Sequence, residues 1–341
     1  MTTTSGLRLP TLRLGVIGAG TIAEFHVAAA RRTGGQAQVV AVCDVRAEAA
    51  EKLAAEAGAL VFTDHRAMID AGGLDAVVIT VPHALHTPIT LDAAAAGLHV
   101  LLGEADPPPT REDAIRMIEA CRAAGVVFAV GHVLRFVPTL RAAASYLASG
   151  ELGRVVVASE RRTADYADPA RPRWFLDPGM AGGGIVLNVG THSIDKLQML
   201  VGSPIVEVTG HTAAPAGGSV ETEAVALARH ADGTRSTISV TGTGLPFTDE
   251  AEVVCGEGAI RISRGEGVWS FRRGVATQVA APEPGEMTTA FAAQLADFAR
   301  ACAENGTPEV TPEYALSVLD VALAVYESSR QGSSITVKGQ L

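Results

Sequence analysis

A glycine-rich turn near the N-terminus constrains the fold of this chain more than any other feature. The motif Gly-Ala-Gly-Thr-Ile-Ala (Gly18–Ala23) directly follows the apolar run Leu12–Ile17 and opens a helix-compatible segment. In a strand–turn–helix unit of this kind, the first glycine permits a tight turn and the second lets the backbone approach a pyrophosphate, while a small third residue lets helix and strand pack closely. The amides at the start of the helix then face the anion. The motif predicts a Rossmann domain that binds a dinucleotide through Gly18, Gly20, Thr21 and Ile22.

The end of the second predicted strand indicates which dinucleotide binds. Asp44 follows the strand-like run Gln38–Cys43, and a carboxylate at that place accepts hydrogen bonds from the adenosine ribose hydroxyls and repels a 2′-phosphate. This favours NAD over NADP, although Arg46 would soften the preference by pairing with a phosphate. The competing interpretation makes the glycine motif a turn of some other α/β fold and Asp44 a helix cap.

Two sequence patterns divide the chain. Up to about residue 130, short runs rich in Val, Ile and Leu alternate with helix-like segments, which indicates a doubly wound α/β arrangement with a parallel sheet covered on both faces. After about Gly150, the predicted strands are joined by hairpin-like turns and accompanied by three helical segments. We therefore expect an N-terminal Rossmann domain over residues 10–131. Residues 132–341 should form a C-terminal α+β domain with a large, open, mostly antiparallel sheet, whose last helices are free to pack back on the first domain.

The open sheet and the composition bear on partners. An open sheet needs something to cover its exposed face, so we expect a homodimer or homotetramer formed through it. The net charge of −10 and the lack of a basic cluster in the sequence argue against nucleic acid and membrane surfaces. No run approaches the ~20 apolar residues of a membrane span. The four cysteines are far apart, which fits a reduced, cytoplasmic protein and speaks against a zinc or other metal site.

Four further stretches resemble one protein family along nearly the whole chain. They are Thr80–His86, Gly97–Leu102 leading to Glu104, His132–Phe136, and Gly182–Asp195 with Arg173-Trp174 before it. On these stretches and the glycine motif, the chain is similar to the Gfo/Idh/MocA oxidoreductases, the glucose–fructose oxidoreductase and inositol dehydrogenase group. The resemblance implies a two-domain, NAD(P)-dependent enzyme that transfers hydride between nicotinamide and a sugar-like or cyclitol-like alcohol.

The resemblance also implies roles for single residues. His192 is expected to act as acid/base, because an imidazole titrates near neutral pH, with Asn188 and Glu104 as orienting groups. Cofactor contacts beyond the glycine turn and Asp44 are expected from Val81, Pro82, His83, His86, Glu104 and Trp174. Substrate contacts are expected from Asn188 and His192. From their positions in the predicted fold, they are also expected from His132 and Arg135 at the carboxyl end of a parallel strand and from Tyr166 on a loop before Trp174. For His83, His86, His132 and Trp174, a role in packing or capping is the alternative.

The chain departs from the family pattern in two places. Most members carry Glu-Lys-Pro after the fifth strand, whereas Gly103–Pro107 reads Gly-Glu-Ala-Asp-Pro with no lysine nearby. Many members carry aspartate where Asn188 stands, and an amide orients a ligand without stabilising an imidazolium by charge. Losing a lysine that polarises the reacting oxygen costs a factor comparable to the ~10²–10⁴ of general acid–base catalysis. Two alternatives therefore stay open: an NAD(H)-binding protein without catalysis, and an NAD-dependent lyase or glycosidase that oxidises its sugar transiently.

Lys196 and the glycine run before His192 need their own interpretation. Lys196 lies one helical turn after His192, ~6 Å farther from Asn188 and the expected pocket. We therefore expect a surface or helix-capping lysine. The run Gly182–Gly184 is expected to let the backbone approach the substrate closely.

Overall fold

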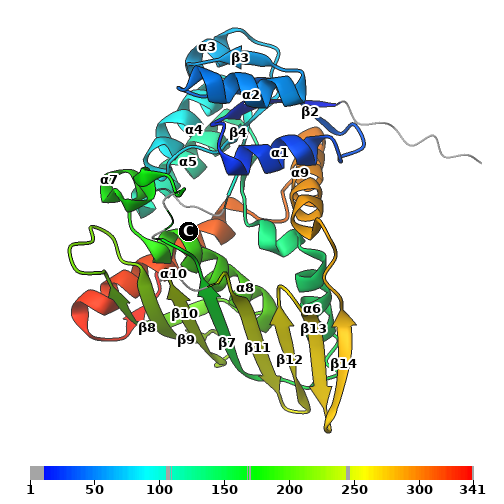
Figure 1. The fold of residues 1–341 in the computed structure, drawn as a ribbon, viewed down its shortest axis with the longest axis vertical. Coiled ribbons are helices and arrows are strands. Elements are labelled where there is room, and N and C mark those ends of the chain that lie inside the picture. The colour runs from blue at the N-terminus through cyan, green and yellow to red at the C-terminus, as the bar shows by residue number, and fades with distance from the viewer. Residues whose placement is uncertain are drawn as a thin grey trace, which may run out of the picture.

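The computed structural model describes residues 11–104, 108, 110–166, 168, 170–242 and 246–339 of the 341-residue chain. The polar N-terminus and Ala105–Pro107, where the family lysine is missing, lie outside the described residues. The described chain forms two sheets, which lie toward opposite ends of the long axis of the molecule in Figure 1.

The first sheet is parallel and six-stranded, in the order β3-β2-β1-β4-β5-β6. Its strands are β1 (Leu12–Ile17), β2 (Ala37–Cys43), β3 (Leu60–Phe62), β4 (Ala76–Ile79), β5 (His99–Leu102) and β6 (Phe128–Val130). The helices between them are α1 (Thr21–Ala30), α2 (Ala47–Ala57), α3 (His65–Asp70), α4 (His86–Ala95) and α5 (Arg111–Ala124). β4 is buried along its whole length, as expected where helices cover both faces of a parallel sheet. The strand order reverses between β1 and β4, and such sheets bind ligands outside the carboxyl ends of the strands at that point.

The second sheet has nine strands in the order β14-β13-β12-β11-β7-β10-β9-β8-β15. The strands are β7 (Val155–Thr163), β8 (Ile205–Ala213), β9 (Glu223–His230), β10 (Arg235–Thr241), β11 (Asp249–Cys255), β12 (Gly258–Ser263), β13 (Gly267–Arg272), β14 (Val275–Ala280) and β15 (Ile335–Thr336). Neighbouring strands are antiparallel except β7 and β10, which run parallel. The predicted fold class, a Rossmann domain followed by an α+β domain with an open, mostly antiparallel sheet, is confirmed.

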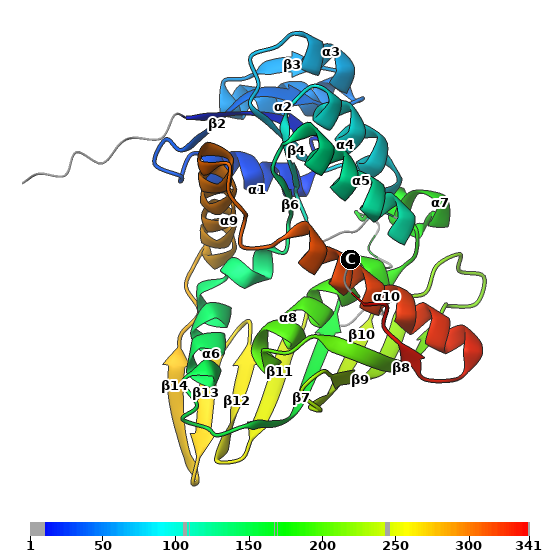
Figure 2. The same cartoon turned by 180° about the vertical axis from the view of Figure 1, so that it is seen from behind.

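Helices cover one face of this sheet. The covering helices are α6 (Pro138–Ala148), α8 (Thr191–Val201) and α10 (Pro312–Gln331), which lie in front of the strands in Figure 2. β9 reflects this arrangement, because its alternate alanines are buried while Val225 and Leu227 are 53% and 50% exposed on the opposite face. In the part of the chain that the structure describes, no helix lies on that opposite face (Figure 1), and no helix is long and apolar enough to span a bilayer.

Helix α9 (Glu286–Glu304) ties the two halves of the molecule together. It follows β14 in the chain and packs against α1 of the first sheet, where the Phe25 and Phe291 rings stack at 5.0 Å. His26 of α1 meets the same Phe291 ring edge-on at 5.0 Å, and its Nε2 lies 2.8 Å from the carbonyl oxygen of Gly103 after β5. These contacts fix the carboxyl edge of the first sheet next to the second domain.

Candidate active site

The glycine turn after β1 has the geometry that its motif predicts. Gly18 has a φ of +98°, and a Cβ there would collide with the backbone carbonyl of Thr80, so glycine is required. A Cβ on Gly20 would meet no atom within 4 Å, which leaves space beside the first turn of α1. Among the described residues, no side chain caps the amides at the start of α1. The turn therefore fits a pyrophosphate, because free amides at a helix N-terminus attract an anion.

Asp44 lies against this turn at the end of β2. Its Oδ2 accepts a hydrogen bond from the Ala19 amide at 2.8 Å, and its Oδ1 accepts one from the Arg46 amide at 2.9 Å. The exposed guanidinium of Arg46 lies 3.3 Å from the same carboxylate. The carboxylate thus stands beside the glycine turn, where a ribose-binding group is expected, and Arg46 pairs with it.

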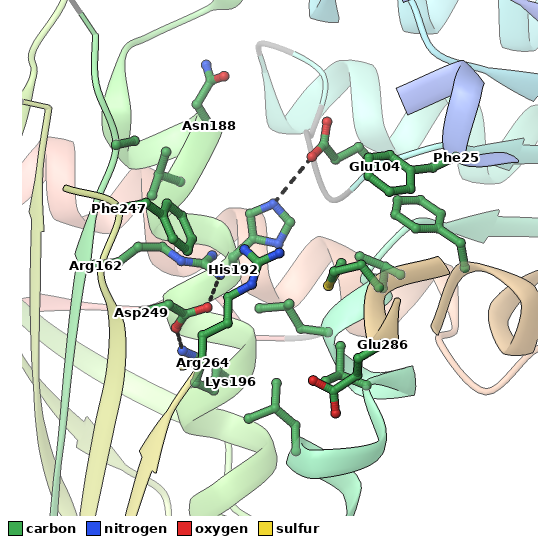
Figure 3. A pocket seen from close by; sticks show the side chains of 18 of the residues that line it. Phe25, Glu104, Arg162, Asn188, His192, Lys196, Phe247, Asp249, Arg264 and Glu286 are labelled. Atoms are coloured by element: carbon green, nitrogen blue, oxygen red, sulfur yellow. Dashed lines mark hydrogen bonds and ion pairs between the residues drawn. The ribbon is translucent and has the colours of Figure 1, made fainter. Parts of the chain in front are cut away.

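A cavity of about 300 Å³ lies between the two domains (Figure 3). Ile22 and Phe25 of α1 and Glu104 after β5 line it from the first domain, and Asn188 and His192 line it from the second. A charged cluster of the second sheet and α8, which we call the cavity floor, lines it as well; it consists of Arg162, Lys196 and Asp249.

His192 and Glu104 face each other across this cavity. His192, near the start of α8, is 9% exposed, and its Nε2 lies 3.8 Å from Oε1 of Glu104 (Figure 3). Within the described chain, its buried Nδ1 has no hydrogen-bond partner. A buried polar atom left in this state costs free energy unless a ligand completes it. The structure therefore brings together two of the three residues predicted to be catalytic, next to space for a ligand.

Asn188, the third of these residues, lines the same cavity. It lies on η4 (Val186–Gly190), a π-helical turn directly before α8. Its side chain is 7% exposed, and its Nδ2 lacks a hydrogen-bond partner among the residues described. π turns are rare and occur frequently at functional sites. Figure 3 shows the Asn188 side chain apart from the His192 ring, and both residues line the cavity.

Lys196 is not the surface or capping residue that the sequence analysis predicts. It is 1% exposed, and its ammonium contacts Asp249 and, at 3.0 Å, Oε1 of Glu160. Arg162 Nη2 donates to the other oxygen of Asp249 at 2.6 Å. Burial raises the pKa of Asp249, but Arg162 and Lys196 more than offset this and hold that pKa well below its usual value. The prediction is wrong because both carboxylates come from strands far away in sequence, which a helical pattern does not reveal.

His132 and Arg135, predicted to bind substrate, belong to a second buried cluster around Asp195. Arg135 Nε and the Tyr314 hydroxyl both donate to Oδ1 of the buried Asp195 at 2.6 Å, and His132 Nδ1 lies 3.6 Å from Oδ2. Burial and the nearby Asp195 carboxylate raise the pKa of Tyr314 well above its ordinary value. None of these side chains is among the described residues that line the cavity. The structure thus places His132 and Arg135 in a buried polar cluster apart from the described cavity lining, and their contact with substrate stays a prediction.

The histidines after β4 lie at the junction of the two domains. His83 is fully buried, its Nδ1 is 2.7 Å from the carbonyl oxygen of Ala181 in α7 (Pro178–Ala181), and its ring is 5.2 Å from that of Trp174. His86 Nε2 is 2.8 Å from the Val81 carbonyl oxygen. Of the cofactor contacts expected beyond the glycine turn and Asp44, five are absent from the described cavity lining, namely Val81, Pro82, His83, His86 and Trp174. Contact of these residues with the cofactor therefore stays a prediction.

The glycine run before η4 packs against protein side chains. Glu221 accepts hydrogen bonds from the Gly184 and Val186 amides at 2.9 and 3.1 Å, and from the Tyr326 hydroxyl at 2.6 Å. A Cβ on Gly183 would collide with Tyr326, and one on Gly184 would collide with Glu221. Tyr326 and Glu221 thus pack closely against this run, and an approach of its backbone to substrate stays a prediction.

Several lining residues escape the sequence analysis. Arg171 and Phe247 line the cavity, whereas Tyr166, which we expected there, is buried beneath the Arg171 guanidinium at 4.1 Å from its ring centre. Arg264 after β12 and Glu286 at the start of α9 line it too. These residues come from separate connections between strands and helices, so no single motif marks them.

Comparison with known proteins identifies the family and supports the fold. Residues 12–132 match the model of an oxidoreductase family with an NAD-binding Rossmann fold, and residues 140–261 match the model of the GFO/IDH/MocA C-terminal domain. The chain belongs to the Gfo/Idh/MocA oxidoreductase family. The 1,5-anhydro-D-fructose reductase of Ensifer adhaerens is 29% identical over 96% of this chain and 98% of its own length. An inositol 2-dehydrogenase of Streptomyces avermitilis is 30% identical over 74% of this chain and 72% of its own.

The solved structures support the same fold. Levoglucosan dehydrogenase in complex with NADH superposes with a TM-score of 0.87 at 23% identity, covering 96% of this chain and 99% of that one. The predicted NAD-binding Gfo/Idh/MocA oxidoreductase is thereby confirmed. The named relatives are dehydrogenases and reductases, so they favour neither a non-catalytic binding protein nor a lyase.

Proposed function

We propose that this protein transfers hydride between NAD and a secondary hydroxyl of a sugar-like or cyclitol-like substrate, with His192 as the acid/base. The observation that carries the proposal is the placement of His192 and Glu104 3.8 Å apart in a cavity that Ile22 of the glycine turn also lines. The acid/base group is therefore adjacent to the first turn of α1, which is the end of a dinucleotide site that holds the pyrophosphate.

The residues of the first domain hold the dinucleotide. Gly18 and Gly20 give the backbone access, the amides from Thr21 onward face the pyrophosphate, and Asp44 accepts the ribose hydroxyls. When bound, the nicotinamide supplies the hydride acceptor or donor. Glu104 lies beside both His192 and α1, so it orients the reacting groups at the meeting point of the two domains.

The second domain handles the proton. Oxidation of a secondary alcohol removes the hydroxyl proton while hydride leaves the carbon, and a positioned imidazole serves as the base. His192 offers a ring nitrogen in the cavity, and the Glu104 carboxylate stabilises the imidazolium that forms. Asn188, with its unpartnered Nδ2, orients a substrate oxygen. This division of labour supplies the chemistry without the lysine of the Glu-Lys-Pro motif.

The names of the relatives point to the substrate class. They act on 1,5-anhydro-D-fructose, on inositol and, for the structural neighbour, on levoglucosan. All three are compact rings with several hydroxyl groups, which fits a cavity that combines apolar walls with polar groups. We therefore assign a monosaccharide-sized, polyhydroxylated ring as the substrate class.

NADH formation on a panel of sugars and cyclitols tests this proposal. The wild type is expected to turn over some member with NAD. His192→Asn should lose a factor of about 10²–10⁴ in kcat while it binds NADH as the wild type does. His211→Asn, at an exposed position on β8, is the matched control and should keep full turnover. Unchanged turnover of His192→Asn would sink the catalytic assignment.

We propose that the protein forms a homo-oligomer through the open face of the second sheet. We also propose that it works in the cytoplasm. Val157, Val225 and Leu227 are 40–53% exposed on strands β7 and β9, and such an apolar face is a common subunit interface. Four free cysteines fit a reducing compartment. Light scattering tests the assembly: Leu227→Glu is expected to shift a dimer or tetramer toward the monomer, and a monomeric wild type would contradict it.

A further inference from the structure

In the described chain, only some of the cationic side chains that line the cavity have a carboxylate partner. Four cations line it, Arg162, Arg171, Lys196 and Arg264. Two of them are neutralised: Arg162 pairs with Asp249, and Lys196 pairs with Asp249 and Glu160. The other two lie within 4.0 Å of no carboxylate in the part of the chain that the structure describes.

The remaining carboxylates of the cavity are occupied elsewhere. Glu104 faces His192 at 3.8 Å. Glu286 accepts a hydrogen bond from the Thr139 amide at 2.9 Å, where it caps the start of α6. Within the described chain, Arg171 and Arg264 are therefore the two cations of the cavity lining without a carboxylate partner.

Aromatic rings hold both guanidinium groups in place. Arg171 lies over Tyr166 at 4.1 Å and Phe175 at 4.4 Å, and Arg264 lies over Phe247 at 4.9 Å. Such stacking fixes the plane of a guanidinium and leaves its N–H edge free for an acceptor. Within the described chain, the buried Nε of Arg171 has no hydrogen-bond partner, so one acceptor is missing at this place.

We propose that Arg171 and Arg264 form an anion subsite, and that the substrate is a sugar bearing a carboxylate or a phosphate ester. This inference rests on the proposed function, since it names the substrate class of the same cavity. An anionic group supplies the acceptor that the buried Arg171 Nε lacks in the described chain, and a planar guanidinium matches the paired oxygens of such an anion. With the anion anchored there, the hydroxyls of the ring extend toward His192, which lines the same cavity.

Matched substrate pairs test the subsite. The pairs are D-glucuronate against D-glucose, D-gluconate against D-glucitol, and glucose 6-phosphate against glucose, each with NAD and with the full chain. We expect kcat/KM to be at least about tenfold higher for an anionic member of a pair than for its neutral counterpart. The double variant Arg171→Gln/Arg264→Gln should lose about 10- to 100-fold on the anionic substrate and stay within about threefold on the neutral one.

The control and a second readout keep the outcome decisive. Arg272→Gln, at an exposed position on β13, should leave the preference unchanged. Calorimetric binding of each sugar to the NADH complex separates the subsite from turnover: anion binding that the double variant loses supports the subsite even if no sugar is oxidised, in which case only the proposed reaction fails. Equal use and binding of neutral and anionic sugars, or an anion preference that survives the double substitution, would overturn the subsite. The carboxylate and phosphate arms show which anion it takes.

Discussion

Helix α8 contributes to two buried polar clusters. One of them lines the cavity, and the other lies outside the cavity lining. The cavity floor joins Lys196 and Arg162 to Asp249, and it lines the site. The other cluster joins Asp195 to Arg135 and Tyr314 and lies outside the cavity lining. Because neighbouring helical residues point ~100° apart, two adjacent positions of one helix serve the site and the packing of the second domain. Charged residues close to His192 are therefore assigned to the cavity or to packing by where their side chains point, and not by their residue type.

Removing the ammonium of the cavity floor should have the largest effect on stability. Lys196→Met leaves Glu160 and Asp249 buried with one cation fewer, which is expected to cost about 3–5 kcal/mol of the free energy of unfolding. Chemical denaturation measures this cost. Lys52→Met is the matched control, because Lys52 forms an exposed pair with Glu24 at 3.5 Å and should cost under about 1 kcal/mol. Equal costs for the two lysines would contradict the floor assignment.

Removal of one hydrogen bond from the Asp195 cluster should cost less unfolding free energy and leave turnover unchanged. Tyr314→Phe removes the hydroxyl that donates to Asp195 at 2.6 Å and is expected to cost about 1–3 kcal/mol. Since Tyr314 does not line the cavity, kcat/KM should stay within about threefold of wild type. Tyr146→Phe, for a half-buried tyrosine, serves as the control. A large loss of kcat/KM at unchanged stability would place the Asp195 cluster in the active site.

The stabilisation that the two clusters contribute should be lost at opposite ends of the pH scale. The pKa of Asp249 is held below its ordinary 3.8 by Arg162 and Lys196, against the effect of burial, so its stabilisation is present above that pH and is lost as the pH falls through the folded value. Burial and Asp195 raise the pKa of Tyr314 above 10, so that contribution is present below pH 10 and is lost as the pH rises further. The slope of unfolding free energy with pH should flatten on the acid side in Asp249→Asn and on the alkaline side in Tyr314→Phe. Unaltered slopes would refute these two assignments.

The comparison also shows where prediction from sequence succeeds. The dinucleotide turn was predictable because Gly18, Gly20 and the flanking strand and helix are neighbours in the chain, so spacing alone defines their geometry. His192, Asn188 and Glu104 were found through family motifs, and the structure brings all three to one cavity. These signals are local, and each one needs only a strand, a turn or a helix around it.

Prediction fails where contacts join distant strands. Lys196 was predicted to lie at the surface because its partners Glu160 and Asp249 are 36 and 53 residues away in the sequence. The pocket was expected near Asn188, whereas the cavity also reaches Arg162 of β7 and Asp249 of β11. Arg171 and Arg264 sit in connections that carry no motif, and the strands β13 and β14 were not predicted. In each case the deciding information is the pairing order of the second sheet.

A crystal structure of the protein with NADH is the most direct test of the central claim, that a nicotinamide reaches the cavity where His192 faces Glu104. Our account predicts the pyrophosphate at the Gly18–Thr21 turn, the adenosine ribose on Asp44, and the C4 edge of the nicotinamide in the cavity within reach of a substrate carbon beside His192. A nicotinamide ring that lies outside this cavity, with His192 sealed off from it, would contradict the account.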